Sequence, residues 1–270
     1  MAATAACAVA TKTIELGIGV WNPYLRHPAQ IAMEIGALDE LSGGRASLGI
    51  GSGLAAPIGK LGIDNSRPLG ALRDTFAIVR GLLRGESVTH KGAVFSVEDM
   101  KLSYRPLRAD VPLLMAARGE RALALCGRIA DGLMISNMCP PGFTHHARQA
   151  AGASRVVQYV PCAVGPERAQ AVATMKPVLA GMLKTFRGLA QKVPAARTSL
   201  FTYSGIPEAD FATAEPDERF VEAFSVTGDA DDVRRRLAAY EAVGVTDLVL
   251  TFIGADPLAG MAYLLRASGA

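Results

Sequence analysis

Four short apolar segments of the sequence end in glycine or in small polar residues. These ends are Gly19-Val20-Trp21-Asn22, Gly51-Ser52-Gly53, Ala117-Arg118-Gly119 and Ser136-Asn137. Because glycine has no side chain, a flat ring or a phosphate group can approach its backbone closely. A single glycine at such an end has a plainer interpretation, a turn from strand to loop. The recurrence at four ends is what favours a binding site.

The third of these ends has the residue types of an anion site. Ala117-Arg118-Gly119-Glu120-Arg121 lies where an apolar segment passes into a helical pattern. The first N–H groups of a helix have no partner within the helix, and they attract anions. Arg118 and Arg121 add positive charge, so the segment predicts a phosphate site. A capped and solvated helix start is the alternative interpretation.

A dinucleotide-binding fingerprint is matched by GSGLAA, residues 51–56. In that fingerprint the glycines open a helix whose N-terminus binds a pyrophosphate. Pro57 and Gly59 follow at once and oppose such a helix. A second strand ending in an acid about 20 residues later is also missing, since Asp74 falls within a helical pattern. We therefore do not expect a Rossmann site.

The histidines and cysteines do not form a catalytic or metal-binding set. The histidines are His27, His90, His145 and His146, and the last two are adjacent, so they cannot share a helix face and are expected at the surface. The cysteines are Cys7, Cys126, Cys139 and Cys162. Their wide spacing without a CxxC pair opposes a zinc site and a disulfide framework. We expect reduced cysteines and no bound metal, and we assign no catalytic residue.

The elements that must position these ends alternate between apolar strands and helical patterns. Strands are expected at 14–20, 45–53, 111–117, 132–137, 155–164 and 247–252. Helices are expected at 27–41, 68–84, 118–131, 167–192 and 229–245, and a hairpin at 88–104. Segment 193–226 is irregular and is interpreted as an inserted loop or a lid. Strands that are apolar on both faces, each followed by a helix, indicate a parallel α/β sheet, either doubly wound or closed as a barrel.

Composition and charge exclude several classes of protein. The chain has 270 residues, half of them hydrophobic, with no compositional break that would mark a second domain. The net charge is only +3, and the densest basic run, 234–236, follows aspartates, so we expect a solvated helix face and no nucleic-acid partner. The alanine-rich start lacks the basic region of a signal peptide, and no run approaches the roughly 20 apolar residues of a membrane span. We expect a soluble, cytoplasmic protein.

Three blocks of the sequence, in order, resemble one known family. The blocks are LGIGVWNPYLRHP (16–28), LDELSGGRASLGIGSG (38–53) and VPLLMAARGERALALCGRIADGLMISN (111–137). They resemble the bacterial luciferase-like monooxygenase superfamily. More narrowly, they resemble its coenzyme F420-dependent oxidoreductases, a branch that includes methylenetetrahydromethanopterin reductase. The likeness continues more weakly through 159–169 and 226–250.

The resemblance implies a TIM (β/α)8-type barrel, one domain over residues 1–270, that binds coenzyme F420 or FMN. It implies a non-prolyl cis peptide bond at Gly19-Val20, in a bulge that supports the cofactor ring. It places the cofactor phosphate at the turn of Arg118-Gly119-Glu120-Arg121, and Trp21 would wall the pocket. The candidate cofactor-binding residues are Gly19, Val20, Asn22, Gly51, Ser52, Gly53, Ala117, Arg118, Gly119, Arg121, Ser136 and Asn137.

The sequence departs from the family pattern in two places. In the family, the strand that matches 14–20 is the third of eight, so the first two βα units are expected to be missing. Six of the eight barrel strands are then visible, and the start of the chain resembles the end of the second helix. Leu54 stands where some relatives carry an acid, so no general acid or base is carried over.

The leading hypothesis is a deazaflavin-dependent oxidoreductase that exchanges a hydride with a small organic substrate, which the sequence does not identify. One alternative is a non-catalytic or degenerate flavin-binding homologue. Another is an FMN-dependent monooxygenase of the same superfamily. Family members are commonly dimers, and the unpaired edges of an open barrel would favour self-association, so we expect a homodimer.

Overall fold

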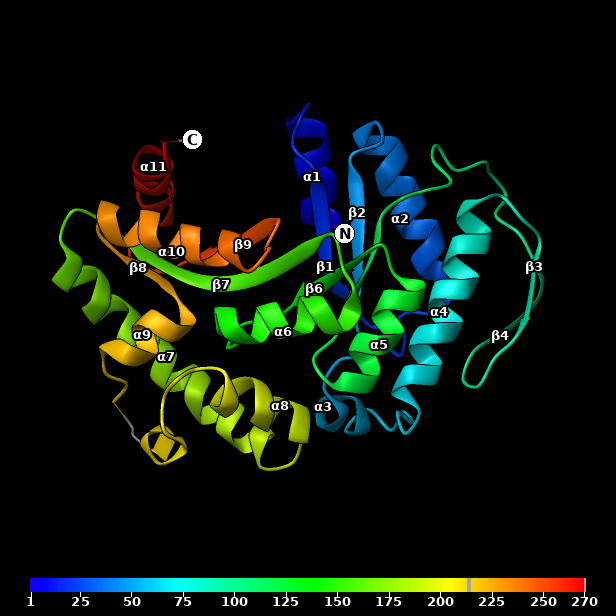
Figure 1. The fold of residues 1–270 in the computed structure, drawn as a ribbon. Helices are drawn as coiled ribbons and strands as arrows, with labels where there is room; N and C mark the ends of the chain where they lie inside the picture. The colour runs from blue at the N-terminus through cyan, green and yellow to red at the C-terminus, as the bar shows by residue number, and fades with distance from the viewer. Residues whose placement is uncertain (213–214, 270) are drawn as a thin grey trace. The chain divides into compact units, whose positions relative to one another are not determined.

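The computed structural model describes residues 1–212 and 215–269, and the chain divides into two compact units (Figure 1). The first unit comprises residues 1–117 and 124–134. The second comprises residues 118–123 and those from 135 onward. Each unit contains parallel strands with helices attached to them.

The first unit is built on parallel strands that pair in the order β1, β2, β5 and β6. These are β1 (Leu16–Trp21), β2 (Ala46–Ile50), β5 (Leu113–Ala116) and β6 (Gly132–Ile135). Its helices are α1 (Ala2–Ala10), α2 (Pro28–Ser42), α3 (Ala55–Gly59), α4 (Pro68–Leu83) and most of α5 (Glu120–Ile129). Every residue of β2 is buried, as expected for a parallel strand with a neighbour on each side and helices over its faces.

The second unit is organised around β7 (Val156–Val164), which pairs in parallel with β8 (Val226–Gly228) and β9 (Asp247–Phe252). Its helices are α6 (Pro141–Ala151), α7 (Arg168–Ala190), α8 (Pro194–Arg197), α9 (Glu218–Phe224), α10 (Ala230–Ala242) and α11 (Pro257–Ser268). Two short helical turns lie between α8 and α9. The first, η1 (Thr198–Thr202), is π-helical and the second, η2 (Glu208–Ala212), is a 3-10 helix.

All six strands predicted from the sequence are present, and the structure adds the three-residue strand β8. A strand of that length is too short to show a period in the sequence. The five predicted helices are also found, but α3, α6, α8, α9 and α11 were not predicted. The short α3 (Ala55–Gly59) corrects the expectation that Pro57 and Gly59 oppose a helix there. The longest of the unpredicted helices are α6 and α11. Both begin with proline, which looks like a break in a sequence although it is favoured in the first turn of a helix. The described part of 193–226 consists largely of short helical turns, and its interpretation as a lid stays a prediction.

The described residues contain no helix that is long and apolar enough to cross a membrane. Within the same residues there is no group of three or more His, Cys, Asp or Glu side chains that could hold a metal ion. All four cysteines are free thiols. Burial raises the pKa of Cys126 to about 11 and that of Cys162 to about 12, so both thiols stay protonated and unreactive near neutral pH.

A hairpin of β3 (Val88–Lys91) and β4 (Ser96–Met100) runs alongside α4 (Figure 1). The buried Asp74 of α4 holds it there: its carboxylate accepts hydrogen bonds from the N–H groups of Val94 (2.7 Å) and Phe95 (3.1 Å). The Nε2 atom of His90 lies 3.1 Å from the same carboxylate. Burial raises the pKa of Asp74, but these hydrogen bonds outweigh it and hold the pKa below the ordinary 3.8.

Asp74→Asn is expected to lower the free energy of unfolding by about 1–3 kcal/mol at pH 7, because hydrogen bonds to a charged acceptor are lost. The folded-state pKa is depressed, so this stabilisation is complete above about pH 4 and is lost as pH falls through the folded-state value. Urea unfolding of both proteins between pH 7 and pH 2 measures it. A difference between them that does not shrink in acid would contradict the assignment.

Candidate functional site

The carboxyl ends of β1 and β2 bring together six of the predicted site residues. This ring-side cluster consists of Gly19, Val20, Asn22, Gly51, Ser52 and Gly53. The peptide bond Gly19-Val20 is cis, and the pairing with β2 shifts register between Gly19 and Trp21. The predicted cis bond and bulge are therefore confirmed. Val20 is 40% exposed, which leaves its face of the strand end open.

The side chain of Asn22 ties the two strand ends together. Its Nδ2 donates to the carbonyl of Ser52 (3.1 Å), and its Oδ1 accepts from the N–H of Tyr24 (2.8 Å). A Cβ atom built on Gly53 would lie only 2.2 Å from Asn22 Nδ2, and Gly53 has a φ of +70°. Glycine is thus required at position 53 both by the close approach and by the backbone conformation.

Gly53→Ala is expected to destabilise the protein by about 1–2 kcal/mol, the cost of a left-handed non-glycine residue, and to displace Asn22. Because Asn22 joins the strand ends, binding of any ring at this cluster should weaken as well. The matched control is Gly59→Ala, where the added Cβ meets nothing within 4 Å. Thermal unfolding together with ligand titration measures both effects, and equal behaviour of the two variants would contradict the assignment.

Two aromatic residues next to this cluster differ in their surroundings. Trp21 is buried, and the guanidinium carbon of Arg26 lies 5.0 Å from the centroid of its ring, so Trp21 supports the strand from within. The hydroxyl of Tyr24 is buried and has no partner among the described residues. Burial and the charge of Asp64 raise the pKa of Tyr24, so the hydroxyl stays protonated and can donate a hydrogen bond to a bound molecule. Sequence reasoning did not select Tyr24.

The second unit contains an anion-side cluster around Arg118, formed with Gly119, Arg121, Ser136 and Asn137. The Arg118 Nη2 group donates to Ser136 Oγ (2.6 Å) and to the Asn137 carbonyl (3.0 Å), and Nη1 donates to Ser199 Oγ (3.0 Å). No described carboxylate pairs with this guanidinium, whose acceptors are all neutral. Its positive charge is therefore available to an anion.

The start of α5 adds donors to the anion-side cluster. The N–H groups of Ala122 and Leu123 already donate to the carbonyl of Gly119. Those of Glu120 and Arg121 donate to no acceptor within the described chain, and such groups at a helix start bind anions. The Arg121 side chain is exposed. Ala117, the remaining predicted residue, lies in the first unit at the end of β5.

Two acceptors near Arg118 bear on what could bind there. Asn137 Oδ1 is buried without a hydrogen-bond partner among the described residues, so it can accept a hydrogen bond from a ligand hydroxyl. The carboxylate of Glu120, at the start of the same helix, is in hydrogen-bond contact with His146, whose Nε2 lies 2.8 Å from its Oε1. A molecule with a phosphate and neighbouring hydroxyls matches this set of donors and acceptors.

The side chain of His146 is 33% exposed, as a surface position allows, but its ring also packs against other side chains. Its ring stacks on Tyr203 at a centroid distance of 5.3 Å, and Tyr203 also contacts Phe143 at 5.7 Å. His145, in contrast, is exposed as expected. His146 thus joins the start of α5 to a residue of segment 193–226, a contact between positions too distant in sequence for spacing to indicate.

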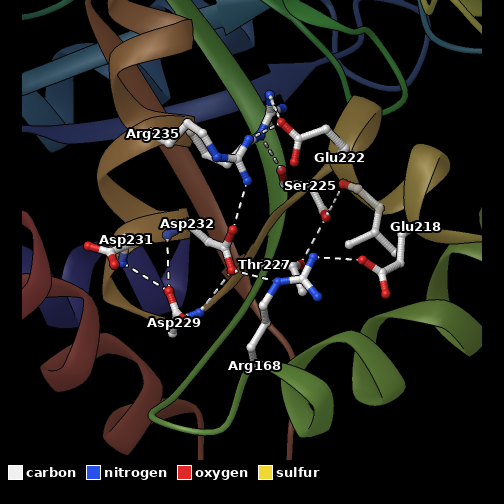
Figure 2. Close-up of polar contacts among 11 residues, drawn as sticks. Arg168, Glu218, Glu222, Ser225, Thr227, Asp229, Asp231, Asp232 and Arg235 are labelled. Atoms are coloured by element: carbon white, nitrogen blue, oxygen red, sulfur yellow. Dashed lines mark hydrogen bonds and ion pairs between the residues drawn. The ribbon is translucent and has the colours of Figure 1, made fainter.

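A separate polar network joins the starts of α7 and α10 with α9 (Figure 2). Arg168 donates to Glu218 (2.6 Å) and to Asp232 (3.1 Å), and Asp232 also accepts from Arg235 (2.7 Å). Burial raises the pKa of Asp232, but the hydrogen bond from Arg235 and the neighbouring charges hold it below 3.8. Arg235 also pairs with Glu222. Because these acids are paired, the network is structural.

The run of arginines at 234–236 is only partly the solvated face that the sequence predicted. Arg234 and Arg235 are largely exposed and pair with acids, as expected. Arg236 is 5% exposed, and its Nε donates to the buried carbonyl of Ser225 (3.1 Å). The prediction of a solvated side chain was wrong for Arg236. This position of α10 faces α9 and Ser225, the residue that follows α9.

Comparison with known proteins agrees with this fold. The family model for luciferase-like monooxygenases matches residues 1–247, and the chain belongs to this family. The 5,10-methylenetetrahydromethanopterin reductase of Methanolobus tindarius is 32% identical over 259 residues, which cover 90% of this chain and 78% of the relative. An F420-dependent glucose-6-phosphate dehydrogenase of Beutenbergia cavernae is 29% identical over 275 residues. The match covers 97% of this chain and 78% of that relative.

A solved structure supports the fold class as well. The coenzyme F420 dependent tetrahydromethanopterin reductase from Methanopyrus kandleri superposes with a TM-score of 0.79 at 26% identity. The match covers 98% of this chain and 84% of that protein. The predicted TIM-barrel type of fold is thereby confirmed.

Proposed function

We propose that this protein is a coenzyme F420-dependent oxidoreductase, which transfers a hydride between the deazaflavin and a small organic substrate. The observation that carries the proposal is the anion-side cluster, where a guanidinium without a carboxylate partner lies beside free N–H groups of a helix start. The names of the relatives, which are F420-dependent enzymes, support the choice of cofactor.

Each cluster is considered by itself for the contacts that it could make with such a cofactor. Arg118 and Ser136 would bind the phosphate together with the N–H groups at the start of α5, and Asn137 Oδ1 would accept a hydrogen bond from a hydroxyl. Gly19 and Val20 offer an exposed strand end against which a flat ring can pack. When bound, the deazaflavin supplies the redox chemistry, and the protein supplies orientation and electrostatics.

Titration of the purified protein with oxidised F420, and separately with FMN, tests the proposal. Equilibrium dialysis should show saturable binding of F420, tighter than that of FMN and weaker at high salt, because the phosphate contact is electrostatic. Preferential binding of FMN would support the monooxygenase instead. Binding of neither cofactor would overturn both assignments and favour a non-catalytic homologue.

We also propose that the protein works as a homodimer in the cytoplasm. Every residue of β9 is at least partly exposed, and an exposed strand edge favours self-association. Analytical ultracentrifugation over a range of concentrations measures the oligomeric state. A monomer at all concentrations would contradict the homodimer.

A further inference from the structure

Ser199 lies buried in the π-helical turn η1, 81 residues from Arg118 in the sequence, and its hydroxyl is also within hydrogen-bond reach of the Cys139 thiol. Its Oγ donates to the carbonyl of Ala196 (3.1 Å) and accepts from Arg118 Nη1 (3.0 Å). A serine hydroxyl has one proton, and Ser199 donates it to the carbonyl of Ala196. Its oxygen therefore presents a lone pair to Arg118 Nη1. Short π-helical turns are found often at functional sites.

The guanidinium of Arg118 is held at both ends by neutral groups. Nη1 is bound to Ser199, and Nη2 is bound to Ser136 and Asn137. The guanidinium carbon also lies 5.2 Å from the centroid of the Phe186 ring. A planar guanidinium with these contacts keeps one orientation, and its Nε proton and one Nη1 proton are left for a ligand.

The chain beside Ser199 also packs against the start of α5. A Cβ atom built on Gly119 would lie 3.2 Å from the Cβ of Ala195, so a side chain at position 119 would push this segment away. Gly119 was selected as a cofactor-binding residue, and the structure gives it this packing contact. Residues 195–199 therefore form one wall of the anion-side cluster.

We infer that Ser199 is a positioning residue that orients Arg118 for anion binding, so that residues 195–199 contribute to the phosphate site. The inference rests on the proposed function, because the anion in question is the cofactor phosphate. It also assigns a role to part of the segment that the sequence describes only as an insertion or a lid.

Ser199→Ala tests the inference by binding measurements with F420 and, separately, with inorganic phosphate. Loss of one hydrogen bond to a charged group should weaken binding of each probe by about 3- to 30-fold. The control is Ser204→Ala, in the same segment, whose hydroxyl donates to the carbonyl of Phe201 and does not contact Arg118. The control should bind both probes as the wild type does. Unchanged affinity of Ser199→Ala would overturn the inference.

A double-mutant cycle separates positioning from a general effect on folding. If Ser199 acts through Arg118, adding Ser199→Ala to Arg118→Gln should cause no further loss of phosphate affinity. An equal loss in both backgrounds would mean that Ser199 only stabilises the fold, and would overturn the inference. Wild-type binding of phosphate without binding of F420 would overturn the proposed cofactor but leave the role of Ser199 measurable. Binding of neither would overturn both.

Discussion

Arg118→Gln is expected to weaken binding of F420 by about 10- to 100-fold. A hydrogen bond between charged groups contributes about 1.5–3 kcal/mol, and each 1.4 kcal/mol changes affinity tenfold. The charge of Arg118 has no carboxylate partner among the residues that the structure describes, so binding an anion breaks no ion pair. Glutamine keeps a polar side chain of moderate size but cannot supply the charge. Equilibrium dialysis of wild type and variant measures the ratio.

The matched control for this prediction is Arg128→Gln, an exposed arginine in the last turn of the same helix. Arg128→Gln removes the same charge from the protein, but from the other end of the helix. The affinity of this variant for F420 should stay within about twofold of wild type, because exposed charges at a distance are screened. Raising the salt concentration should weaken wild-type binding more than that of Arg118→Gln. Equal losses in both arginine variants would assign the effect to net charge.

The features that the sequence predicted well are those encoded by neighbouring residues. The strand ends with glycine and the turn at Arg118-Gly119 each lie within a few positions, so a short motif contains them. Their type follows from local rules of backbone freedom and helix starts. The family resemblance then added the cis bond, which no composition or spacing indicates.

The features that the sequence missed depend on contacts between distant positions. Ser199 meets Arg118 only because η1 folds back to the start of α5, and Tyr203 meets His146 in the same way. Neither contact leaves a pattern in the sequence, since a serine or a tyrosine in an irregular segment is ordinary. Arg236 shows the same limit, because its charge predicted exposure while its place on α10 decided burial.

Asp39→Ala is expected to lower the free energy of unfolding by about 3 kcal/mol, the largest stability effect that we predict. The carboxylate of Asp39 is buried and accepts from Nε (3.1 Å) and Nη2 (2.5 Å) of Arg108 and from the N–H of Ala46 (3.3 Å). Arg108 Nη2 also donates to the carbonyl of Ala46 (2.8 Å), so the pair joins α2 to the start of β2. Its hydrogen bond with Asp39 raises the pKa of Arg108. Removing one partner of a buried pair leaves the other charge uncompensated, which costs about 3–5 kcal/mol, and partial exposure of Arg108 favours the lower end.

Glu34→Ala is the control for Asp39→Ala, because Glu34 also lies on α2 and pairs with an arginine, Arg26, at 3.1 Å. That pair is more exposed and should contribute less than about 1 kcal/mol. Urea unfolding followed by circular dichroism measures both variants. Replacing Arg108 with methionine in the Asp39→Ala background should recover part of the loss, since it removes the uncompensated charge. If Asp39→Ala costs no more than Glu34→Ala, the ion pair does not hold β2 in place, and the position of Gly51-Ser52-Gly53 at its end must depend on apolar packing alone.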